Sequence, residues 1–422
     1  MVMSCCATVC VAEQPVTPAT AELERCYFDM LTQTVDATSG LVPDAVDFHT
    51  GQAMNPVSIA GVGMQLVAGT VGVQRGWIDR QQAAEQAERV LRFLLEQSPH
   101  NHGWMYHFID PRSGARAWRC EVSSIDTALL VAGALVSGQF FHDTPVHGLA
   151  QQLYERIDFE WMLTNGGTKP DSQTLCMGWK PESDFLKPRW DQYSELMILY
   201  QLAIGSPTHP IPAETWAAFE RPMTTYGKLQ SLACGPLFTH QYAQLFIDFR
   251  KRRDALGFNY FTSSVNATRI NRQFCIDRAD RYSTFSDTGW GLSACLGAEG
   301  YRAYGATHDE HVDGTINPSA AVSSIVFTPQ ASQSLIDALF ADKQVFGRFG
   351  LVESYNADRN WRSPRVVALD AGMAMVAIEN YRTGLIWQLY MSHPATQRAM
   401  QRIGFADDAR DDLFIQPQLT AK

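Results

Sequence analysis

Apolar segments alternate with amphipathic ones along this chain, and that alternation restricts its fold more than any other feature. Segments 56–70, 123–141 and 190–204 are apolar almost throughout, as helices buried on all sides would be. Segments 78–97 and 145–157, which lie between them, carry apolar residues on one face only. Two concentric rings of helices satisfy both patterns, because an inner helix is buried all round and an outer helix on a single face.

Further segments extend the pattern over the rest of the chain, and together they predict about a dozen helices. In the first of them, Leu23, Tyr27 and Leu31 stand four residues apart and form an apolar stripe. Asp79 is a suitable N-cap for segment 78–97. These further segments are 19–35, 212–221, 238–249, 332–341, 372–381 and 395–403. The sequence therefore predicts an all-α fold with two rings of helices.

The chain has no segment with the composition of an interdomain linker, so we predict a single domain over 19–422. Its 45% hydrophobic content is sufficient for a packed core. Residues 1–18 are predicted to be a disordered or leader-like tail. This tail is mildly apolar but short and has no Lys or Arg, which makes it a poor secretory signal. We expect no membrane span, since no apolar run reaches the roughly 18 residues that one needs.

The charge distribution argues against nucleic acid as a partner. The net charge is −10, and Lys and Arg are scattered apart from the run 250–253, which we expect at a solvated helix end. A neutral glycan needs no charge complementarity, so an acidic surface is compatible with one.

Metal and cofactor sites have little support. The nine cysteines include no CxxC pair, so we predict no structural zinc, and Cys176, Cys234, Cys275 and Cys295 are interpreted as buried apolar residues. His100, His102 and His107, and the run 308–311, lack the spacing of an HExxH site and are expected on polar loops. The chain also has no GxSxG, P-loop or dinucleotide fingerprint.

Acidic residues stand in apolar or aromatic segments. Glu121 and Asp126 lie in RCEVSSIDTALLVAGAL, and Glu195 lies in RWDQYSELMILYQLAIGSP. A carboxylate in such a place costs several kcal/mol unless it is hydrogen-bonded, paired or facing a wet cleft. Carboxylates that gather with aromatic rings suit sugar chemistry, because rings stack on pyranose faces while acid and base groups act on the bond between sugars. These residues indicate a glycosidase.

Several long blocks, in one order from about residue 20 to 405, resemble the glucoamylase-like family of bacterial proteins, which includes glycoside hydrolase family 144, the endo-β-1,2-glucanases. The blocks are GWMYHFIDPRSGARAWRCEVSSIDTALLVAGAL (103–135), WDQYSELMILYQLAIGSPTHPI (190–211), HQYAQLFIDFR (240–250), HVDGTINPSAAVSSIVFTP (311–329), and RFGLVESYNADRNW through VALDAGMAMVAIENYRTGLIWQLYM (348–391). The resemblance implies an (α/α)6 barrel with a pocket at one end, inverting hydrolysis of β-1,2-glucan, and a periplasmic or secreted location. Glycoside cleavage by acid and base groups needs no cofactor.

One block departs from the family pattern. Relatives read roughly ASDGPDGY shortly after WGL, whereas here Trp290, Gly291, Leu292 and Ser293 are followed by ACLGAEGY. Leu296 stands where an Asp is expected, and Cys295 replaces a Ser. Since this loop resembles part of the substrate cleft, a related β-glucan transglycosylase, a glycosidase on another glucan, or a non-catalytic glycan-binding barrel stays open as an alternative.

Glu195 is the predicted general acid. Aromatic neighbours Trp190, Tyr193 and Tyr200 would desolvate its carboxyl and raise the pKa, which suits a group that protonates the glycosidic oxygen. The segment also matches the family's YSE motif. The structural alternative is a carboxylate bonded to a neighbouring Arg or to backbone.

Glu121 and Asp126 are the candidates for the base. Ser123 or Ser124 is a suitable cap for the following helix, so both carboxylates would lie near its N-terminal end, where the helix dipole favours the ionised form. That position suits a base that activates water or a group that holds sugar hydroxyls. The structural alternative is helix capping by Glu121 and a core hydrogen bond by Asp126.

Other polar and aromatic residues of the matched blocks are candidates for substrate binding. Those expected to bond sugar hydroxyls are His240, Asp313, Glu353, Asn356, Asp370, Glu379 and Arg382. Those expected to stack on sugar rings are Tyr242, Trp290, Trp361 and Tyr381. Simpler roles compete with these: Asp370 as an N-cap, Asp313 within its own turn, and His240 or any single aromatic ring in the core.

Overall fold

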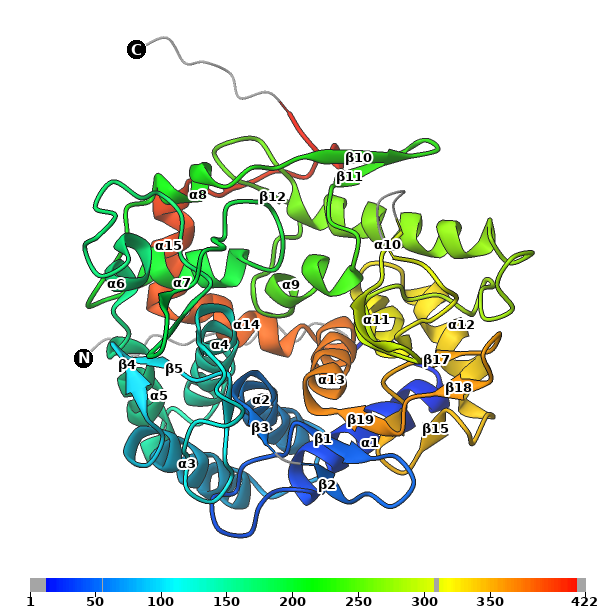
Figure 1. Ribbon diagram of the computed structural model, residues 1–422, viewed down its shortest axis with the longest axis horizontal. Helices are drawn as coiled ribbons and strands as arrows, with labels where there is room; N and C mark the ends of the chain where they lie inside the picture. Colours follow the sequence, from blue (N-terminus) through cyan, green and yellow to red (C-terminus); the bar gives the residue numbers. More distant parts are fainter. Residues whose placement is uncertain (1–12, 55, 307–310, 416–422) are drawn as a thin grey trace.

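A computed structural model describes residues 13–54, 56–306 and 311–415 (Figure 1). The predicted tail 1–18 lies mostly outside this range, as do residues 308–310 of the histidine-containing run. The fold is predominantly helical, as predicted, with short strands between the helices. None of the helices in the described ranges combines the length and the hydropathy needed to cross a lipid bilayer.

One set of helices is buried almost completely and lies toward the centre of the molecule (Figure 1). Its members are α2 (Ile59–Gln74), α4 (Ser124–Phe140), α7 (Met197–Gly205), α9 (Tyr242–Phe246), α11 (Pro318–Ser323) and α13 (Ala368–Arg382). Helices α2 and α4 pack against each other very closely, because Gly63 and Gly133 meet with no side chain between them. A Cβ atom on either glycine would collide with the backbone of the other helix. The small, apolar composition of these segments thus permits all-round burial.

A second set of helices covers the first and lies toward the rim (Figure 1). These are α1 (Pro18–Gln33), α3 (Arg80–Glu96), α5 (Pro145–Glu155), α10 (Tyr260–Ile276), α12 (Pro329–Phe340) and α15 (Pro394–Ile403). Several begin with local signals in the sequence: Asp79 caps α3 as predicted, Thr17 caps α1, and proline occupies the first turn of α1, α5, α12 and α15. Helix α1 packs on α2 and α13, α3 on α2, α5 on α4, α12 on α11, and α15 on α7.

Shorter elements complete the chain. The remaining helices are α6 (Phe159–Thr164), α8 (Thr215–Ala218), α14 (Leu385–Ser392) and the 3-10 helices η1 (Leu237–His240) and η2 (Ser324–Val326). Strands of two to four residues form sheets of two or three strands. They are β1 (Ala45–Asp47), β2 (Ala53–Met54), β3 (Val57–Ser58), β4 (His100–Asn101), β5 (Trp104–Met105), β6 (Phe108–Ile109), β7 (Val122–Ser123), β8 (Gly178–Lys180), β9 (Asp184–Phe185), β10 (Met223–Tyr226), β11 (Leu229–Leu232), β12 (Arg252–Arg253), β13 (Ala294–Gly297), β14 (Gly300–Ala303), β15 (Phe346–Gly347), β16 (Gly350–Leu351), β17 (Tyr355–Asn356), β18 (Trp361–Arg362), β19 (Arg365–Val367) and β20 (Ala406–Asp407).

Long connections lead from a covering helix to the next buried one, as in 34–58, 97–123, 277–317 and 341–367. Connections in the other direction, such as 75–79 and 141–144, are short. The short strands tie the long connections to one another. Strand β1 pairs with β19, so that Ala45 lies opposite Val367, and β3 pairs with β6, so that Ser58 lies opposite Phe108. Segments far apart in sequence therefore meet at the ends where the buried helices begin.

Some predicted helices are shorter in the structure. The predicted helix 190–204 begins only at Met197, because the backbone before it bonds to other segments: Tyr193 donates to the Glu220 carbonyl, and Trp190 donates to the Leu175 carbonyl. The predicted helices 212–221 and 238–249 are likewise reduced to α8 and to η1 with α9. The run 250–253 does not end a helix. It enters β12, where Arg253 is buried and pairs with Asp408.

Candidate active site

A cavity of about 400 Å³ lies at the N-terminal ends of the buried helices. Ser58, Val367, Leu369 and Asp370 line it from the starts of α2 and α13. The rest of the wall comes mainly from the long connections and consists of Asp44, His107, Phe108, Trp118, Phe238, Tyr242, Ser293, Ala294, Tyr301, Glu353 and Arg365. Polar, acidic and aromatic side chains thus share one concave surface.

His107 joins the two predicted base candidates. Its Nδ1 atom lies 3.1 Å from Glu121 Oε1, and its Nε2 atom lies 3.5 Å from Asp126 Oδ1. Burial alone would lower the pKa of His107, but the charge of Asp126 and the hydrogen bond to Glu121 raise it. The hydrogen bond to His107 in turn lowers the pKa of Glu121 to about 2. Glu121 is therefore ionised at neutral pH and is held beside the His107 ring.

Asp126 lies in the first turn of α4, where the helix dipole favours negative charge. Ser123 is the N-cap of this helix, as the sequence predicted for this position or the next. Its hydroxyl accepts from the Asp126 backbone N–H and lies 2.5 Å from the Asp126 Oδ2 atom, to which it donates. Glu121 precedes the cap and takes no part in it. Ser123 therefore caps the helix, and Glu121 pairs with His107 instead.

Glu195 lies in the turn directly before α7 and is half-buried. Desolvation raises the pKa of Glu195 to about 7, and the negative charge of Asp126 adds to this effect. Among the described residues, no Lys, Arg or His forms an ion pair with Glu195. A carboxyl group with these properties holds its proton near neutral pH and can donate it.

Asp370 is a second carboxyl group of this kind. Its Oδ2 atom accepts a hydrogen bond of 3.0 Å from the Asn317 side chain, and desolvation raises the pKa of Asp370 to about 7. The predicted N-cap role is wrong, because α13 begins at Ala368 with Val367 in the cap position. Asp370 instead lies within the first turn and lines the cavity.

Tyr242 lies close to acidic groups from several segments of the chain. It lines the cavity and packs against Phe238 with 5.1 Å between ring centroids. Desolvation raises the pKa of Tyr242 well above its ordinary range, and so do the charges of Asp370, Tyr301, Glu195 and Asp126. These groups come from α13, β14, the turn before α7, and α4. Carboxyl groups from separate helices thus surround one position in the cavity wall.

Glu353 lines the cavity, but protein donors occupy its oxygen atoms. Oε1 accepts from the Leu296 backbone N–H and from Arg365, each at 3.0 Å. Oε2 accepts from Ser363 at 2.9 Å and from Arg365 at 2.6 Å. A carboxylate has about four acceptor positions, so no position is left for a sugar hydroxyl. The predicted sugar-binding role does not fit Glu353, which instead fixes strand β13 to β19.

Three predicted binding residues lie in the core. Trp290 has no exposed surface on which a sugar could stack. His240 is bonded on both ring nitrogens, by Tyr193 at 3.0 Å and the Cys234 carbonyl at 2.9 Å, and burial lowers its pKa to about 4. The side chain of Asn356 is fully buried and donates to the Asp313 carbonyl and to Thr315. Binding roles therefore do not fit Trp290, His240 or Asn356.

Two further candidates are absent from the residues that line the cavity. Asp313 accepts from the Thr315 backbone N–H at 2.9 Å, which is the turn-stabilising alternative considered for it. Trp361 is half-buried in β18, which pairs with β17. A sugar-binding role at either position stays a prediction.

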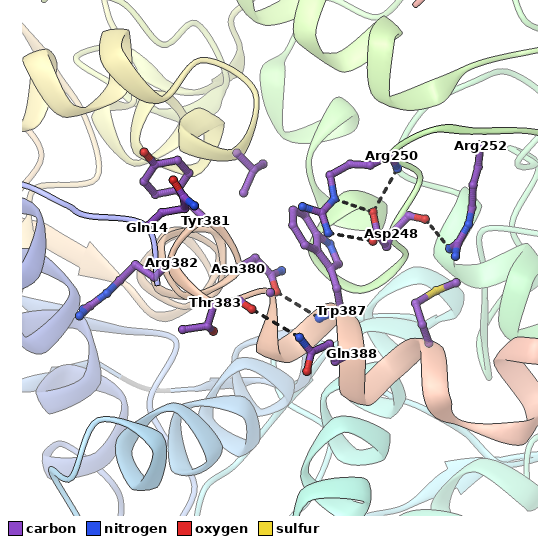
Figure 2. Close-up of a pocket in the computed structure, with 13 residues that line it drawn as sticks. Gln14, Asp248, Arg250, Arg252, Asn380, Tyr381, Arg382, Thr383, Trp387 and Gln388 are labelled. Atoms are coloured by element: carbon purple, nitrogen blue, oxygen red, sulfur yellow. Dashed lines mark hydrogen bonds and ion pairs between the residues drawn. The ribbon is translucent and has the colours of Figure 1, made fainter. Parts of the chain in front are cut away.

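Glu379, Tyr381 and Arg382 lie at the other end of α13 from Asp370. Tyr381 and Arg382 line a different cavity, of about 470 Å³, shown in Figure 2. Glu379 is fully buried and pairs with Arg75 at 2.7 Å, and Arg382 pairs with Glu24 at 2.5 Å. These interactions form a buried ionic network. The three residues therefore lie away from the carboxyl groups of Asp126, Glu195 and Asp370. A sugar-binding role does not fit Glu379, Tyr381 or Arg382.

Sequence analysis missed several residues of the cavity wall. Asp44 stands in the apolar run LVPDAV, and this isolated carboxylate was the signal that could have identified it. His107 was interpreted as an ordinary loop histidine, since only the fold brings it between Glu121 and Asp126. Trp118 and Tyr301 carried no signal beyond their residue type. In the described part of the chain, no group of three His, Cys, Asp or Glu side chains has an arrangement that could hold a metal ion.

Comparison with known proteins supports the sequence resemblance. Residues 187–394 match the Glycoamylase family model, described as “Putative glucoamylase”. A curated protein of Parabacteroides distasonis, an exo β-1,2-glucooligosaccharide sophorohydrolase (non-reducing end), is 28% identical over 387 residues. The match covers 82% of this chain and 53% of that protein. The chain thus spans about half the length of this curated relative.

Solved structures share the fold over most of the chain. The endo-β-1,2-glucanase from Chitinophaga pinensis, in a complex with sophorotriose and glucose, superposes with a TM-score of 0.83 at 26% identity. The match covers 92% of this chain and 98% of that one. The β-1,2-glucanase from Parabacteroides distasonis has the same fold, with a TM-score of 0.84 at 24% identity, over 92% of this chain and 60% of that one. The resemblance to the glucoamylase-like proteins is confirmed.

Proposed function

We propose that this chain, which resembles the glucoamylase-like proteins, is a glycoside hydrolase that cleaves β-1,2-glucan to sophoro-oligosaccharides. Its relatives of known activity, a sophorohydrolase and an endo-β-1,2-glucanase, support the substrate. The cavity supports the chemistry, since aromatic rings and the carboxyl groups of Glu353 and Asp370 line it. Glu195 and Asp126 lie close enough to its wall to raise the pKa of Tyr242.

In this proposal Glu195 is the general acid. Its pKa of about 7 keeps a large fraction protonated at neutral pH, so the carboxyl can donate a proton to the glycosidic oxygen as the bond breaks. Asp126 is the base that removes a proton from the attacking water, and that water adds to the anomeric carbon with inversion. His107 orients Asp126 and neutralises part of the charge shared with Glu121.

The wider architecture belongs to the same proposal. We infer that the two sets of helices form an (α/α)6 double-ring barrel and that residues 19–422 are one domain. The alternating burial of successive helices and the packing of α1, α3, α5, α12 and α15 on buried helices support this arrangement. A periplasmic or secreted location follows from the resemblance alone.

One observation carries the functional proposal: Glu195 has a raised pKa, no cationic partner among the described residues, and the charge of Asp126 nearby. A carboxyl group kept only for stability would be expected to pair with a cation or to bond fully with backbone. Desolvation of Glu195 outweighs the hydrogen bonds with backbone and with Ser194 that lower its pKa, so Glu195 keeps its proton beside a second carboxyl group, as a general acid must.

The test is incubation of the purified protein with linear β-1,2-glucan, followed by thin-layer chromatography of the products. We expect short linear sophoro-oligosaccharides, and we expect Glu195→Gln to reduce their formation by a factor on the order of 10³ or more. Glu96→Gln, on the exposed surface of α3, serves as the matched control. Longer or cyclic products would indicate a transglycosylase, and binding without any product would indicate a glycan-binding barrel.

A further inference from the structure

Two exposed aromatic side chains lie in the wall of the carboxylate-containing cavity. The exposed fraction is 68% for Trp118 and 66% for Tyr301, and both line this cavity. Other strongly exposed large apolar residues in the described ranges, such as Met54, Met223 and Phe414, do not line it. Large aromatic rings are usually buried in the protein. Two exposed rings at one cavity therefore indicate a ligand-binding surface.

The backbone at Trp118 is held in an unfavourable conformation. Trp118 and Arg119 both lie in the left-handed region, with φ values of 51° and 52°. Such conformations persist in residues other than glycine only where the surroundings enforce them, and they concentrate at functional sites. Arg116 enforces this one by donating to the Arg119 carbonyl at 2.7 Å and to the Cys120 carbonyl at 2.5 Å. Its position is fixed in turn by Glu182 at 2.6 Å.

Trp118 is connected to Glu121 and Asp126 through two neighbouring rings, Phe108 and His107. Its ring centroid lies 5.0 Å from that of Phe108, and Phe108 stacks on His107 at 3.9 Å with an interplanar angle of 19°. His107 contacts both Glu121 and Asp126. A continuous aromatic wall therefore runs from the exposed Trp118 ring to the acidic groups.

Tyr301 is presented by a different segment, the β13–β14 hairpin. It lies directly opposite Leu296 in the hairpin register, so the two side chains share a face, and Ala294 of that face also lines the cavity. The hairpin is anchored by Glu353, which accepts from the Leu296 backbone N–H, and by Ser354, which donates to the Leu296 carbonyl at 2.5 Å. The face that contains Leu296 in place of the family's Asp is thus apolar and aromatic.

We propose that Trp118 and Tyr301 are stacking platforms for glucose units outside the pair whose bond is cleaved, and that they set the chain-length preference of the site. This inference rests on the proposed function. An indole and a phenol ring each cover the apolar face of a pyranose, and an unpaired exposed ring gains the most from that contact. Platforms on two separate segments select for chains long enough to reach them from the acidic groups.

The experiment compares Trp118→Ala, Tyr301→Ala and the double variant on linear β-1,2-glucan oligosaccharides of increasing length. We expect each single change to raise KM for long substrates about tenfold, with kcat changed less than about twofold and KM for the shortest cleaved substrate unchanged. Trp118→Phe should retain part of the effect. Arg116→Gln should shift KM in the same direction as Trp118→Ala, and Met223→Ala is the exposed control outside the cavity.

Calorimetric binding of the same oligosaccharides to the Glu195→Gln protein separates this inference from the proposed function. One outcome is that the wild type cleaves glucan while Trp118→Ala and Tyr301→Ala leave KM, product length and binding unchanged. In that case the proposed stacking role is wrong, and the proposed hydrolase function is retained. If the wild type cleaves nothing but Trp118→Ala weakens its binding of long chains, the hydrolase is wrong and the platforms stand. A wild type that neither cleaves nor binds these chains overturns both.

Discussion

The Nε2 atom of His107 lies 3.5 Å from Oδ1 of Asp126, the carboxylate proposed to activate water. The other ring nitrogen is bonded to Glu121 at 3.1 Å, so the imidazole is fixed between two acids. Although burial alone would lower the pKa of His107, the charge of Asp126 and the hydrogen bond to Glu121 raise it and so favour the protonated form, in which both nitrogens donate. His107 thereby orients Asp126, and its hydrogen bond stabilises the ionised form of Glu121.

Replacing His107 should lower the rate, because the ring contacts both acids. In His107→Gln the imidazole between Glu121 and Asp126 is lost, so Asp126 is no longer held in the position proposed for activating water. We expect kcat to fall by about 10²-fold with KM changed less than about twofold. Steady-state kinetics measure both. His209→Gln, on an exposed loop, is the control, and an unchanged kcat would remove His107 from the proposed mechanism.

The basic limb of the profile should report the proton donor. Since the pKa of Glu195 is raised to about 7 and its protonated form is the active one, kcat/KM should fall as the pH rises through about 7, tenfold per pH unit beyond it. Asp370 has a similar pKa, so Asp370→Asn is the discriminating variant. If Asp370→Asn abolishes cleavage while Glu195→Gln retains both the activity and the basic limb, Asp370 is the acid and the assignment of Glu195 is wrong.

The same raised pKa values predict how stability depends on pH. A carboxyl group that binds its proton more tightly in the folded state stabilises the fold below its unfolded pKa, and this contribution is lost as the pH rises toward the folded pKa. For Glu195 and Asp370 that window extends from about 4 to about 7. We expect the melting temperature to decline across the window and the decline to be smaller in Asp370→Asn. Scanning calorimetry of both proteins at half-unit pH steps measures the decline in melting temperature.

The Glu353–Arg365 pair should matter for stability more than a surface pair does. Replacing one partner of a buried ion pair costs about 3–5 kcal/mol, because the other charge stays buried without compensation. Glu353→Gln should therefore lower the free energy of unfolding by about that amount. Glu299→Gln removes the exposed partner of Arg359 and should cost less than about 1 kcal/mol. Urea denaturation of both variants measures the difference, and equal costs would contradict the anchoring role of Glu353.

Glu379 provides a separate test of which cavity is catalytic. Its carboxylate pairs with Arg75 at the far end of α13, so Glu379→Gln should destabilise the fold while leaving kcat and KM unchanged within about twofold. Steady-state kinetics well below the melting temperature, together with a thermal melt, separate the two effects. A large rise in KM in the stable, folded variant would restore the sugar-binding role predicted from sequence.

The helical pattern was readable from sequence because burial leaves a local signal. Segments such as 123–141 are apolar on all faces, and Asp79 caps α3 where the sequence predicts it. The prediction was wrong where long-range bonds replace helical ones. Residues 190–196 have the composition of a helix, yet their backbone N–H groups donate to the carbonyls of residues 175 and 220. Local composition cannot predict hydrogen bonds to segments so far away in the sequence.

The site was predictable only in part for the same reason. Glu195 and Asp126 were identified because an acid in an apolar segment is conspicuous in any sequence. His107 depends on a contact across 14 and 19 residues of chain, and Trp118 depends on a backbone conformation enforced by Arg116. Conversely, Trp290 and Asn356 lie in blocks that match the family but serve the core. Residue type and motif do not distinguish a wall of the cavity from the layer behind it.

Most segments that line the carboxylate-containing cavity connect a rim helix to the following central one, whereas return connections such as 75–79 and 141–144 are short. Substitutions in these connections change the cavity wall and leave the helix–helix contacts in place, provided that anchors such as Glu353 are kept. A lineage could therefore acquire enzymes for different product sizes by changing these connections alone. The hairpin with Leu296 is the natural first position for an engineer to alter.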